Sequence, residues 1–343
     1  MSIKSTKLYE TVQGLMSSNK GLLAADESDA TAGKRLSMVH LPNEPDNRRK
    51  FRELIFTAPK IEEYVSGIIM YDSSIRNTTR DKIPFPDVLL AKGIIPGIKV
   101  DRGTVELQGF KGEFVTRGLD DLTERFTDYY NLGARFAKWR AVIHIGESMP
   151  SDQCLESNAY TLTRYAQLAQ SAGLVPIVEP EVIYDGDHDL ATAEMVTTKT
   201  LQVVFNMMQR YAVDLSGVIL KSSMVLAGRK FDDQTTPDEV ANATIRTFSV
   251  SVPHSIGGIV FLSGGQTPKQ AILNLNAICS KGQQPWQMTF SFSRAIEEPM
   301  LQVWKGRDEN KDEAQAMLLH TVKMNSLALQ GKYDPKKDKK LAD

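Results

Sequence analysis

Eight short apolar segments recur along the whole chain, and longer amphipathic stretches separate them. Short segments rich in Val, Ile and Leu are typical of strands covered on both faces, as in parallel sheets. The segments are 21–26, 66–72, 93–100, 135–143, 174–180, 216–222, 257–263 and 287–291. Strands that alternate with helices in this number predict the α/β fold class, with a single (β/α)8 TIM barrel as its architecture. A doubly wound open sheet is the alternative.

The chain gives no sign of a second domain. No Pro- or Ser-rich linker divides it, so we expect one barrel domain over residues 1–330. Residues 331–343 contain five lysines, and we expect them to form a flexible, solvated tail. Helix starts are signalled at Thr236-Pro-Asp-Glu239 and Thr267-Pro-Lys-Gln270, which both have the pattern of a capping box with proline at the first helical position.

Charge and composition narrow the range of partners. The 41 basic residues nearly balance the 42 acidic ones, so we expect neither nucleic acid nor a membrane surface as a partner. No apolar run approaches the roughly 20 residues that span a bilayer. Cys154 and Cys279 stand far apart and form no disulfide framework or metal-binding spacing. We therefore expect a cytoplasmic protein.

Charged residues gather where the predicted strands end. Barrel enzymes hold their catalytic groups at the carboxyl ends of the strands. Here those ends are Asp26, Asp72, Lys99, Lys138 with Arg140, Glu179 with Glu181, Lys221, Ser263 and Ser291. Because side chains alternate along a strand, we expect Lys138 and Arg140 on one side, and Glu179 and Glu181 on one side. Lysines and glutamates that converge on one end of a barrel indicate a catalytic site.

Lys221 ends the apolar segment Gly217-Val-Ile-Leu-Lys221, where a charge is costly to bury. Burial and a second cation such as Lys138 favour a neutral amine, which is a nucleophile toward carbonyl carbon. Imine formation also needs a proton donor and acceptor, which Glu179 or Glu181 can supply. The alternatives are a strand-end lysine that extends to water and an ion-pair network at the barrel rim.

The last two predicted strands are followed by residues suited to phosphate. Ser263-Gly264-Gly265 follows the seventh segment, and its glycines let backbone N–H groups approach an anion. Ser291 ends the eighth segment and Arg294 follows it. The guanidinium of an arginine matches the geometry of phosphate. Barrels commonly bind phosphate at these two loops, so we expect a phosphate site here.

No metal or cofactor motif accompanies these residues. The acidic segment 185–189 could begin a calcium loop, but Leu190 and Val196 stand where such a loop requires glycine and glutamate, so we expect a solvated turn there. The five histidines show no zinc-binding spacing, and neither a Walker loop nor a GxGxxG fingerprint occurs. We therefore expect no metal and no cofactor, with an imine as the electron sink.

A set of motifs follows in order along nearly the whole chain. They are Leu23-Ala-Ala-Asp26-Glu-Ser28, Gly97-Ile-Lys99-Val-Asp101, Phe136-Ala-Lys138-Trp-Arg140, Ile177-Val-Glu179-Pro-Glu181, Gly186-Asp-His-Asp189, Leu220-Lys221 and Phe261-Leu-Ser-Gly-Gly-Gln266. Through these motifs the chain resembles class I fructose-bisphosphate aldolase, in its long eukaryotic-like form. The resemblance implies a barrel, usually a homotetramer, that reversibly cleaves fructose 1,6-bisphosphate. The products would be dihydroxyacetone phosphate and glyceraldehyde 3-phosphate, in glycolysis and gluconeogenesis.

The resemblance also implies roles for individual residues. Lys221 would form the Schiff base, and Glu179, supported by Glu181, would be the acid and base of carbinolamine dehydration. Asp26 would handle the C4 hydroxyl during carbon–carbon cleavage, and Lys138 would stabilise charge beside the imine. One phosphate would be held by Ser263, Gly264, Gly265, Ser291 and Arg294. Candidates around the other end of the substrate are Lys99, Arg140, Ser28, Thr31, Arg35 and Arg48.

Several positions depart from the family pattern. The replacements are Ser222-Ser223 for Pro-Asn, Phe292-Ser293 for Tyr-Gly, Ala30 and Thr31 for a glycine and a serine, and a final Asp343 for the tyrosine that assists enamine protonation. We therefore expect the step after cleavage to be slow or handled differently. These departures leave the preference between bisphosphate and monophosphate sugars open. The rival hypotheses are a transaldolase, a deoxyribose-phosphate type aldolase, and a barrel kept as a non-enzymatic scaffold.

Overall fold

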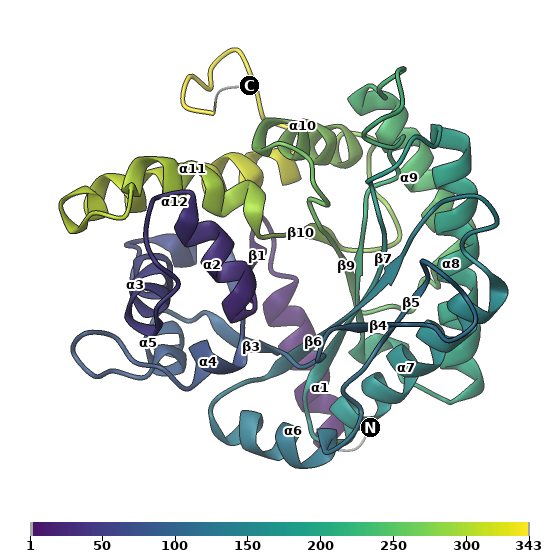
Figure 1. Ribbon diagram of the computed structural model, residues 1–343, viewed down its shortest axis with the longest axis horizontal. Helices are drawn as coiled ribbons and strands as arrows, with labels where there is room; N and C mark the ends of the chain where they lie inside the picture. The colour runs from purple at the N-terminus through teal and green to yellow at the C-terminus, as the bar shows by residue number, and fades with distance from the viewer. Residues whose placement is uncertain (1–2, 342–343) are drawn as a thin grey trace.

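Parallel strands close into a barrel that is wrapped by helices (Figure 1). The structure is a computed structural model, and it describes residues 3–341. Around the barrel the strands follow the order β1-β10-β9-β8-β7-β6-β3-β2. Their bounds are β1 (Gly21–Ala25), β2 (Val65–Met70), β3 (Ile95–Lys99), β6 (Phe136–Ile143), β7 (Val175–Val182), β8 (Ile219–Ser222), β9 (Gly258–Phe261) and β10 (Met288–Phe292). The predicted (β/α)8 barrel is confirmed, and the open sheet is wrong.

Each barrel strand coincides with one predicted apolar segment to within about two residues at its ends. The exception is the start of β8, because Leu215–Gly217 form a short 3-10 helix, η2. Asp214 favours that turn, since its carboxylate accepts the backbone N–H of Ser216 at 3.1 Å. The apolar runs predicted the strands well because most strand residues are buried between the helices outside and the side chains that fill the barrel.

Helices follow the strands and cover the outside of the barrel. They are α1 (Ile3–Leu15), α2 (Asp29–Ser37), α3 (Pro45–Phe56), α4 (Asp72–Ile75), α5 (Phe85–Ala91), α6 (Leu122–Asn131), α7 (Asp152–Ser171), α8 (Leu190–Arg210), α9 (Pro237–Ser251), α10 (Pro268–Cys279), α11 (Arg294–Trp304) and α12 (Lys311–Leu329). The predicted capping box of Thr236 and Glu239 starts α9. Thr267 caps α10 by accepting the backbone N–H of Gln270 at 3.2 Å.

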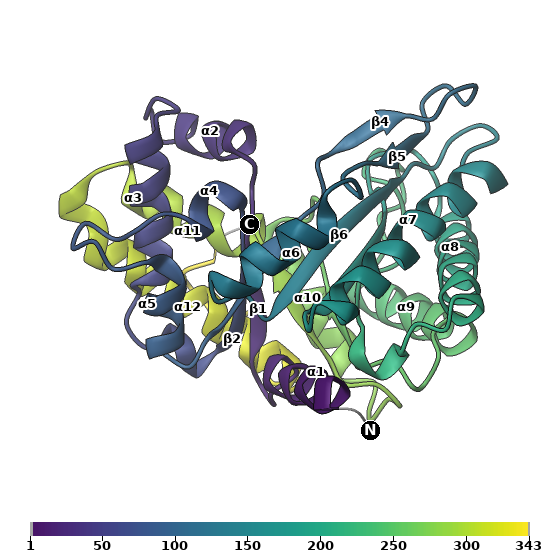
Figure 2. The ribbon, with the colours of Figure 1, turned by 90° about the horizontal axis from the view of Figure 1, so that it is seen from below.

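One end of the barrel is closed by α1, which lies below the strands in Figure 2. Its Leu8, Val12 and Leu15, together with Met16 just after it, form one buried cluster with strand residues such as Phe136. Burying this apolar surface stabilises the closed end by about 25 cal/mol per Å². The polar, inward-facing residues are left at the opposite end, where the strands finish.

An antiparallel pair that the sequence did not predict stands at that opposite end, above β6 in Figure 2. It consists of β4 (Thr104–Glu106) and β5 (Phe114–Thr116). All residues of β4 are exposed, so the segment carries no apolar pattern that could signal a strand. Thr116 ties the pair to the barrel, because its hydroxyl donates to the carbonyl oxygen of Arg140 at 2.7 Å.

The lysine-rich segment after α12 differs in part from the expected solvated tail. Its lysines are exposed, but Tyr333 and Leu341 are buried. Asp338 accepts a hydrogen bond from the Tyr333 hydroxyl at 3.2 Å and lies 2.9 Å from Nε2 of His320. The described part of the segment is therefore anchored, while residues 342–343 of the predicted tail lie outside the described residues.

Among residues 3–341, none of the helices combines the length and the apolar character needed to cross a membrane.

Candidate active site

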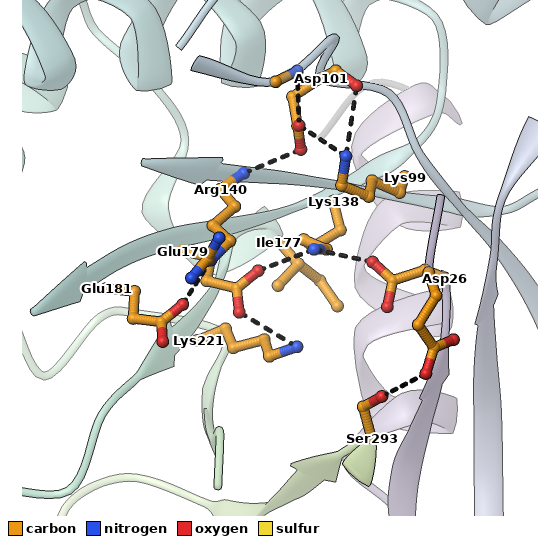
Figure 3. A network of polar contacts seen from close by, with 12 residues as sticks. Asp26, Lys99, Asp101, Lys138, Arg140, Ile177, Glu179, Glu181, Lys221 and Ser293 are labelled. Atoms are coloured by element: carbon orange, nitrogen blue, oxygen red, sulfur yellow. Dashed lines mark hydrogen bonds and ion pairs between the residues drawn. The ribbon is translucent and has the colours of Figure 1, made fainter. Parts of the chain in front are cut away.

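Asp26, Lys138, Glu179 and Lys221 form a chain of ion pairs inside the carboxyl end of the barrel, which we call the barrel-mouth cluster (Figure 3). Lys138 Nζ lies 2.7 Å from Asp26 Oδ2 and 2.9 Å from Glu179 Oε2. Lys221 Nζ lies 3.2 Å from Glu179 Oε1. The cluster assembles because β6, β7 and β8 are neighbours and their inward-facing residues alternate with outward-facing ones. All four side chains are buried.

The charges of this cluster support one another. Burial alone would raise the pKa of Asp26, but the cations Lys138 and Lys221 outweigh burial and lower it to about 2. Burial would also raise the pKa of Glu179, but Lys138 and Lys221 act against it, and the net effect is a lowered pKa. Burial would lower the pKa of Lys138, but Asp26 and Glu179 raise it far above its ordinary value. At neutral pH both carboxyl groups are therefore ionised and Lys138 is a cation.

Lys221 is not the isolated ammonium that its apolar segment suggested. The carboxylate of Glu179 contacts it directly, so the group that would take its proton is already in place. The two serines after it are also accommodated inside the protein. The Ser222 hydroxyl donates to the carbonyl oxygen of Ser223 at 3.0 Å, and the Ser223 hydroxyl donates to that of Val182 at 2.9 Å. Ser223 therefore joins the end of β8 to β7.

Arg140 and Glu181 form a second ion pair, one step nearer the rim. This pair and the barrel-mouth cluster line one cavity of about 380 Å³, which lies in the size range of small-molecule sites. Lys138 and Arg140 of β6 and Glu179 and Glu181 of β7 all line the same cavity, as expected for residues two apart in a strand. The predicted residues that line it are Asp26, Thr31, Arg35, Lys138, Arg140, Glu179, Glu181, Lys221, Ser263, Gly264, Gly265, Ser291 and Arg294.

The predicted phosphate residues line the same cavity from the loop after β9, from β10 and from the start of α11. Gly264 and Gly265 have φ values of +50° and +90°, in the left-handed region that favours glycine. The hydroxyl of Ser291 is buried and has no hydrogen-bond partner within residues 3–341. A buried donor without a partner is costly unless a ligand or water satisfies it, so this wall can receive a polar ligand.

Three predicted residues do not line the cavity. Ser28 caps α2 by accepting a backbone N–H of its first turn at 3.3 Å. Arg48 lies 3.3 Å from a carboxylate oxygen of Asp29. Lys99 Nζ lies 2.6 Å from Asp101 Oδ1. Each has a structural partner in this arrangement, and a contact with substrate stays a prediction for all three.

A second cluster, which we call the flanking cluster, consists of the buried Glu27, Arg52 and Glu297 and the partly exposed Arg35. It joins the end of β1 to α2, α3 and α11, which lie together on one side of the barrel in Figure 1. Arg52 Nη2 lies 2.8 Å from Glu27 Oε2, and its Nη1 lies 3.4 Å from Glu297 Oε1. Arg35 Nε lies 3.8 Å from Glu27 and 3.9 Å from Glu297.

The two carboxyl groups of the flanking cluster have opposite pKa shifts. Burial would raise the pKa of Glu27, but the charge of Arg52 and a hydrogen bond with Glu297 together lower it to about 2. Burial and the neighbouring Glu27 raise the pKa of Glu297 well above its ordinary value. At neutral pH Glu27 is therefore ionised, whereas Glu297 keeps its proton to a higher pH than an ordinary glutamate does. Glu27 also reaches the cavity wall, where Ser293 donates to its Oε1 at 2.8 Å.

Several residues of the cavity wall were not predicted from the strand ends, namely Glu27, Tyr184, Asp185, Arg229 and Ser293. They lie just after strand ends or farther along the following loops, where no spacing in the sequence marks them. Asp185 belongs to the acidic segment expected to be a solvated turn, and the same segment ends in the N-cap of α8. No group of three or more His, Cys, Asp or Glu side chains in the described part of the chain is arranged to hold a metal ion.

Comparison with known proteins identifies the family. A family model described as glycolytic class I fructose-bisphosphate aldolase matches residues 7–343. A Xanthomonas campestris pv. campestris protein named probable fructose-bisphosphate aldolase class 1 is 48% identical over 334 residues, which cover 97% of this chain and 99% of that protein. Cytosolic fructose-bisphosphate aldolase 4 of Arabidopsis thaliana is 44% identical over 332 residues, which cover 96% of this chain and 84% of that protein.

A solved structure supports the same assignment. It contains fructose-bisphosphate aldolase from Plasmodium falciparum in complex with TRAP and a small-molecule inhibitor, and it matches with a TM-score of 0.96 at 40% identity, covering 97% of each chain. The match therefore extends over the whole barrel. This chain belongs to the class I fructose-bisphosphate aldolase family.

Proposed function

We propose that this protein cleaves fructose 1,6-bisphosphate reversibly into dihydroxyacetone phosphate and glyceraldehyde 3-phosphate, through a Schiff base on Lys221. One observation carries the proposal. The buried Lys221 Nζ lines the cavity and lies 3.2 Å from a carboxylate oxygen of Glu179. An amine beside a proton acceptor is the pair that imine formation requires. The names of the relatives support the choice of substrate.

Imine formation begins at the ketone carbon of the substrate. Lys221 passes a proton to Glu179, its nitrogen adds to that carbon, and a second proton moves from the nitrogen to the former carbonyl oxygen to give a carbinolamine. Glu179 then returns its proton to the carbinolamine hydroxyl, which leaves as water. The product is a protonated imine, whose positive charge can accept an electron pair from a neighbouring bond.

Cleavage uses the other half of the barrel-mouth cluster. The ionised carboxylate of Asp26 takes the proton of the C4 hydroxyl, the bond between C3 and C4 breaks, and the aldehyde leaves. The bonding electrons move to the imine, which becomes an enamine. Lys138 lies 2.7 Å from Asp26 and stabilises the negative charge that develops on the C4 oxygen as its proton moves to Asp26. Protonation of the enamine carbon and addition of water then release dihydroxyacetone phosphate and restore Lys221.

The phosphate groups of the substrate have separate supports in the cavity. The Ser263–Gly265 loop, Ser291 and Arg294 provide backbone and side-chain donors for one phosphate. Arg140 lies at another part of the wall and is a candidate for the far end of the substrate. Basic residues in two regions favour a bisphosphate over a monophosphate sugar.

Steady-state cleavage of fructose 1,6-bisphosphate and of fructose 6-phosphate, each with and without EDTA, tests the proposal. We expect faster cleavage of the bisphosphate and no effect of EDTA. Preference for fructose 6-phosphate would point to a transaldolase-like activity, and loss of activity in EDTA would contradict a metal-independent reaction. Absence of cleavage with both sugars would favour the scaffold hypothesis.

We also propose that the protein is a cytoplasmic homotetramer whose partner is a small sugar phosphate. Family analogy supports the tetramer, and the near-balanced charge and the cytosolic plant relatives support the location. Light scattering after gel filtration would test the tetramer. A mass near the 38.2 kDa of one chain would contradict it.

A further inference from the structure

Arg229 lies at the rim of the cavity, in the loop that follows β8. Backbone hydrogen bonds fasten this loop to the one after β7. The N–H of Gly228 donates to the carbonyl oxygen of His188 at 2.7 Å, and the N–H of Arg229 donates to that of Tyr184 at 3.0 Å. A Cβ at Gly228 would lie 2.5 Å from the carbonyl oxygen of Gly186, so only glycine permits this close approach. The start of the Arg229 side chain is therefore held in place.

The guanidinium of Arg229 lies against the predicted phosphate loop. Its Nη2 donates to the carbonyl oxygen of Gly265 at 3.0 Å, and its Cζ lies 5.5 Å from the ring centroid of Tyr184. A Cβ at Gly265 would come within 2.3 Å of Nη2, so the guanidinium occupies the space that a side chain there would fill. About half of the Arg229 side chain remains exposed to solvent, and a ligand in the cavity can reach it.

The charge around this loop is strongly positive. Arg35, Arg229 and Arg294 all line the cavity. Burial, followed by the nearby Arg35 and Arg229, lowers the pKa of Arg294, so these guanidinium groups lie close enough to repel one another. Arg229 Nε lies 3.4 Å from Asp185, whose side chain is largely exposed. An exposed ion pair of this kind is weak and can be exchanged for a stronger, doubly charged partner.

We propose that Arg229 is a further substrate-binding residue, which contacts the phosphate group held by the Ser263–Gly265 loop and Arg294. The inference rests on the proposed function and adds a second arginine, beside Arg294, to its phosphate site. Phosphate oxygens replace the Asp185 carboxylate at the guanidinium, while Tyr184 continues to support its face. Arg229 takes no part in the ion pairs of Lys221, so it affects the binding of phosphate rather than the proton transfers.

The test compares Arg229→Gln and Arg229→Lys with the unchanged enzyme. We expect Arg229→Gln to raise KM for fructose 1,6-bisphosphate about tenfold, and to raise the inhibition constant of inorganic phosphate similarly, with kcat changed less than about twofold. Arg229→Lys keeps the charge but loses the planar fork, and should recover part of the loss. Arg246→Gln is the matched control, because Arg246 pairs with Glu194 on an exposed face and does not line the cavity.

Each outcome separates this inference from the proposed function. If the unchanged enzyme cleaves the bisphosphate and Arg229→Gln leaves KM and phosphate inhibition unaltered, only the Arg229 inference is overturned. A loss of kcat without a change in KM would also overturn it, because it would place Arg229 in the chemistry. If the unchanged enzyme does not cleave the sugar, calorimetric titration with inorganic phosphate still decides. If the unchanged protein and Arg229→Gln then bind inorganic phosphate with equal affinity, a role for Arg229 is excluded.

Discussion

The barrel-mouth cluster and the flanking cluster begin at adjacent residues, Asp26 and Glu27, but they differ in the cations that they use. The barrel-mouth cluster holds two lysines, and an amine, unlike a guanidinium, can lose a proton and become a nucleophile, as proposed for Lys221. The flanking cluster holds Arg35 and Arg52, and a guanidinium keeps its charge in proteins. The first cluster can therefore be changed chemically during a reaction, whereas the second can only orient and neutralise its neighbours.

The positions of the two clusters agree with this difference. Lys138 and Lys221 extend from barrel strands into the cavity, whereas Arg52 and Glu297 extend from helices and are almost fully buried behind it. The hydrogen bond from Ser293 to Glu27 connects the flanking cluster to the cavity wall. We infer that the barrel-mouth cluster carries the reaction and that the flanking cluster holds α2, α3 and α11 around it.

Replacing the nucleophile should give the largest effect. We expect Lys221→Met to lower kcat by roughly 10⁴-fold or more, because no amine remains to form the imine. The melting temperature should change little, since Glu179 keeps Lys138 as its partner. Kinetics with fructose 1,6-bisphosphate and thermal unfolding measure the two effects. Residual activity of Lys221→Met above about 1% would contradict the claim that the barrel-mouth cluster supplies the nucleophile.

Glu179→Gln should give the next largest effect. The amide has nearly the same shape as the carboxylate but cannot accept the proton of Lys221, so we expect kcat to fall by about 10² to 10⁴-fold. Single-turnover kinetics should show that imine formation has become the slow step. Glu194→Gln is the control on an exposed face, where Arg246 is the partner. A variant with unaltered kcat would remove Glu179 from the reaction.

Arg52→Met tests the flanking cluster. We expect it to lower the free energy of unfolding by about 3–5 kcal/mol, because Glu27 would be left buried without its cation. Urea unfolding measures this change, and Arg246→Met, which removes an exposed ion pair, should cost about 0–1 kcal/mol. Equal effects of the two substitutions would mean that the flanking cluster does not hold the fold. A complete loss of activity in folded Arg52→Met would assign it to catalysis instead.

Glu297→Gln should show its effect as a change in pH dependence. The raised pKa of Glu297 means that its contribution to stability is present below pH 4.5, the ordinary value, and is lost as pH rises toward its folded value. Glu27 has the opposite dependence, since its pKa is lowered to about 2 and its contribution is lost as pH falls below 4.5. The glutamine variant should therefore gain stability relative to the unchanged protein as pH rises above about 4.5, by at most about 1.4 kcal/mol per pH unit. Urea unfolding between pH 5 and 8 measures this slope, and parallel curves for the two proteins would show that Glu297 is ionised.

The sequence predicted the barrel and the barrel-mouth cluster because both follow from local patterns. A buried parallel strand is an apolar run, and a charge at the end of such a run, as at Lys221, stands out against it. The exposed β4 carries no such pattern, so it was missed. Alternation along β6 and β7 then placed Lys138 and Glu179 on the inside.

The flanking cluster and Arg229 could not be predicted in the same way. Arg52 and Glu297 are separated by 245 residues and lie on helices, where a charged residue usually faces solvent. Arg229 faces the cavity only because the backbone of its loop is fastened to the loop after β7. Both depend on tertiary contacts between segments that no spacing in the sequence connects.

The central claim is that Lys221 is the nucleophile. Borohydride trapping with dihydroxyacetone phosphate tests this claim most directly. Borohydride reduces an imine to a stable secondary amine, so the labelled lysine can be located by peptide mapping. We expect the label on Lys221 alone, and none in Lys221→Met. Label on Lys138 or any other lysine, or no label on a protein that cleaves the sugar, would contradict the assignment.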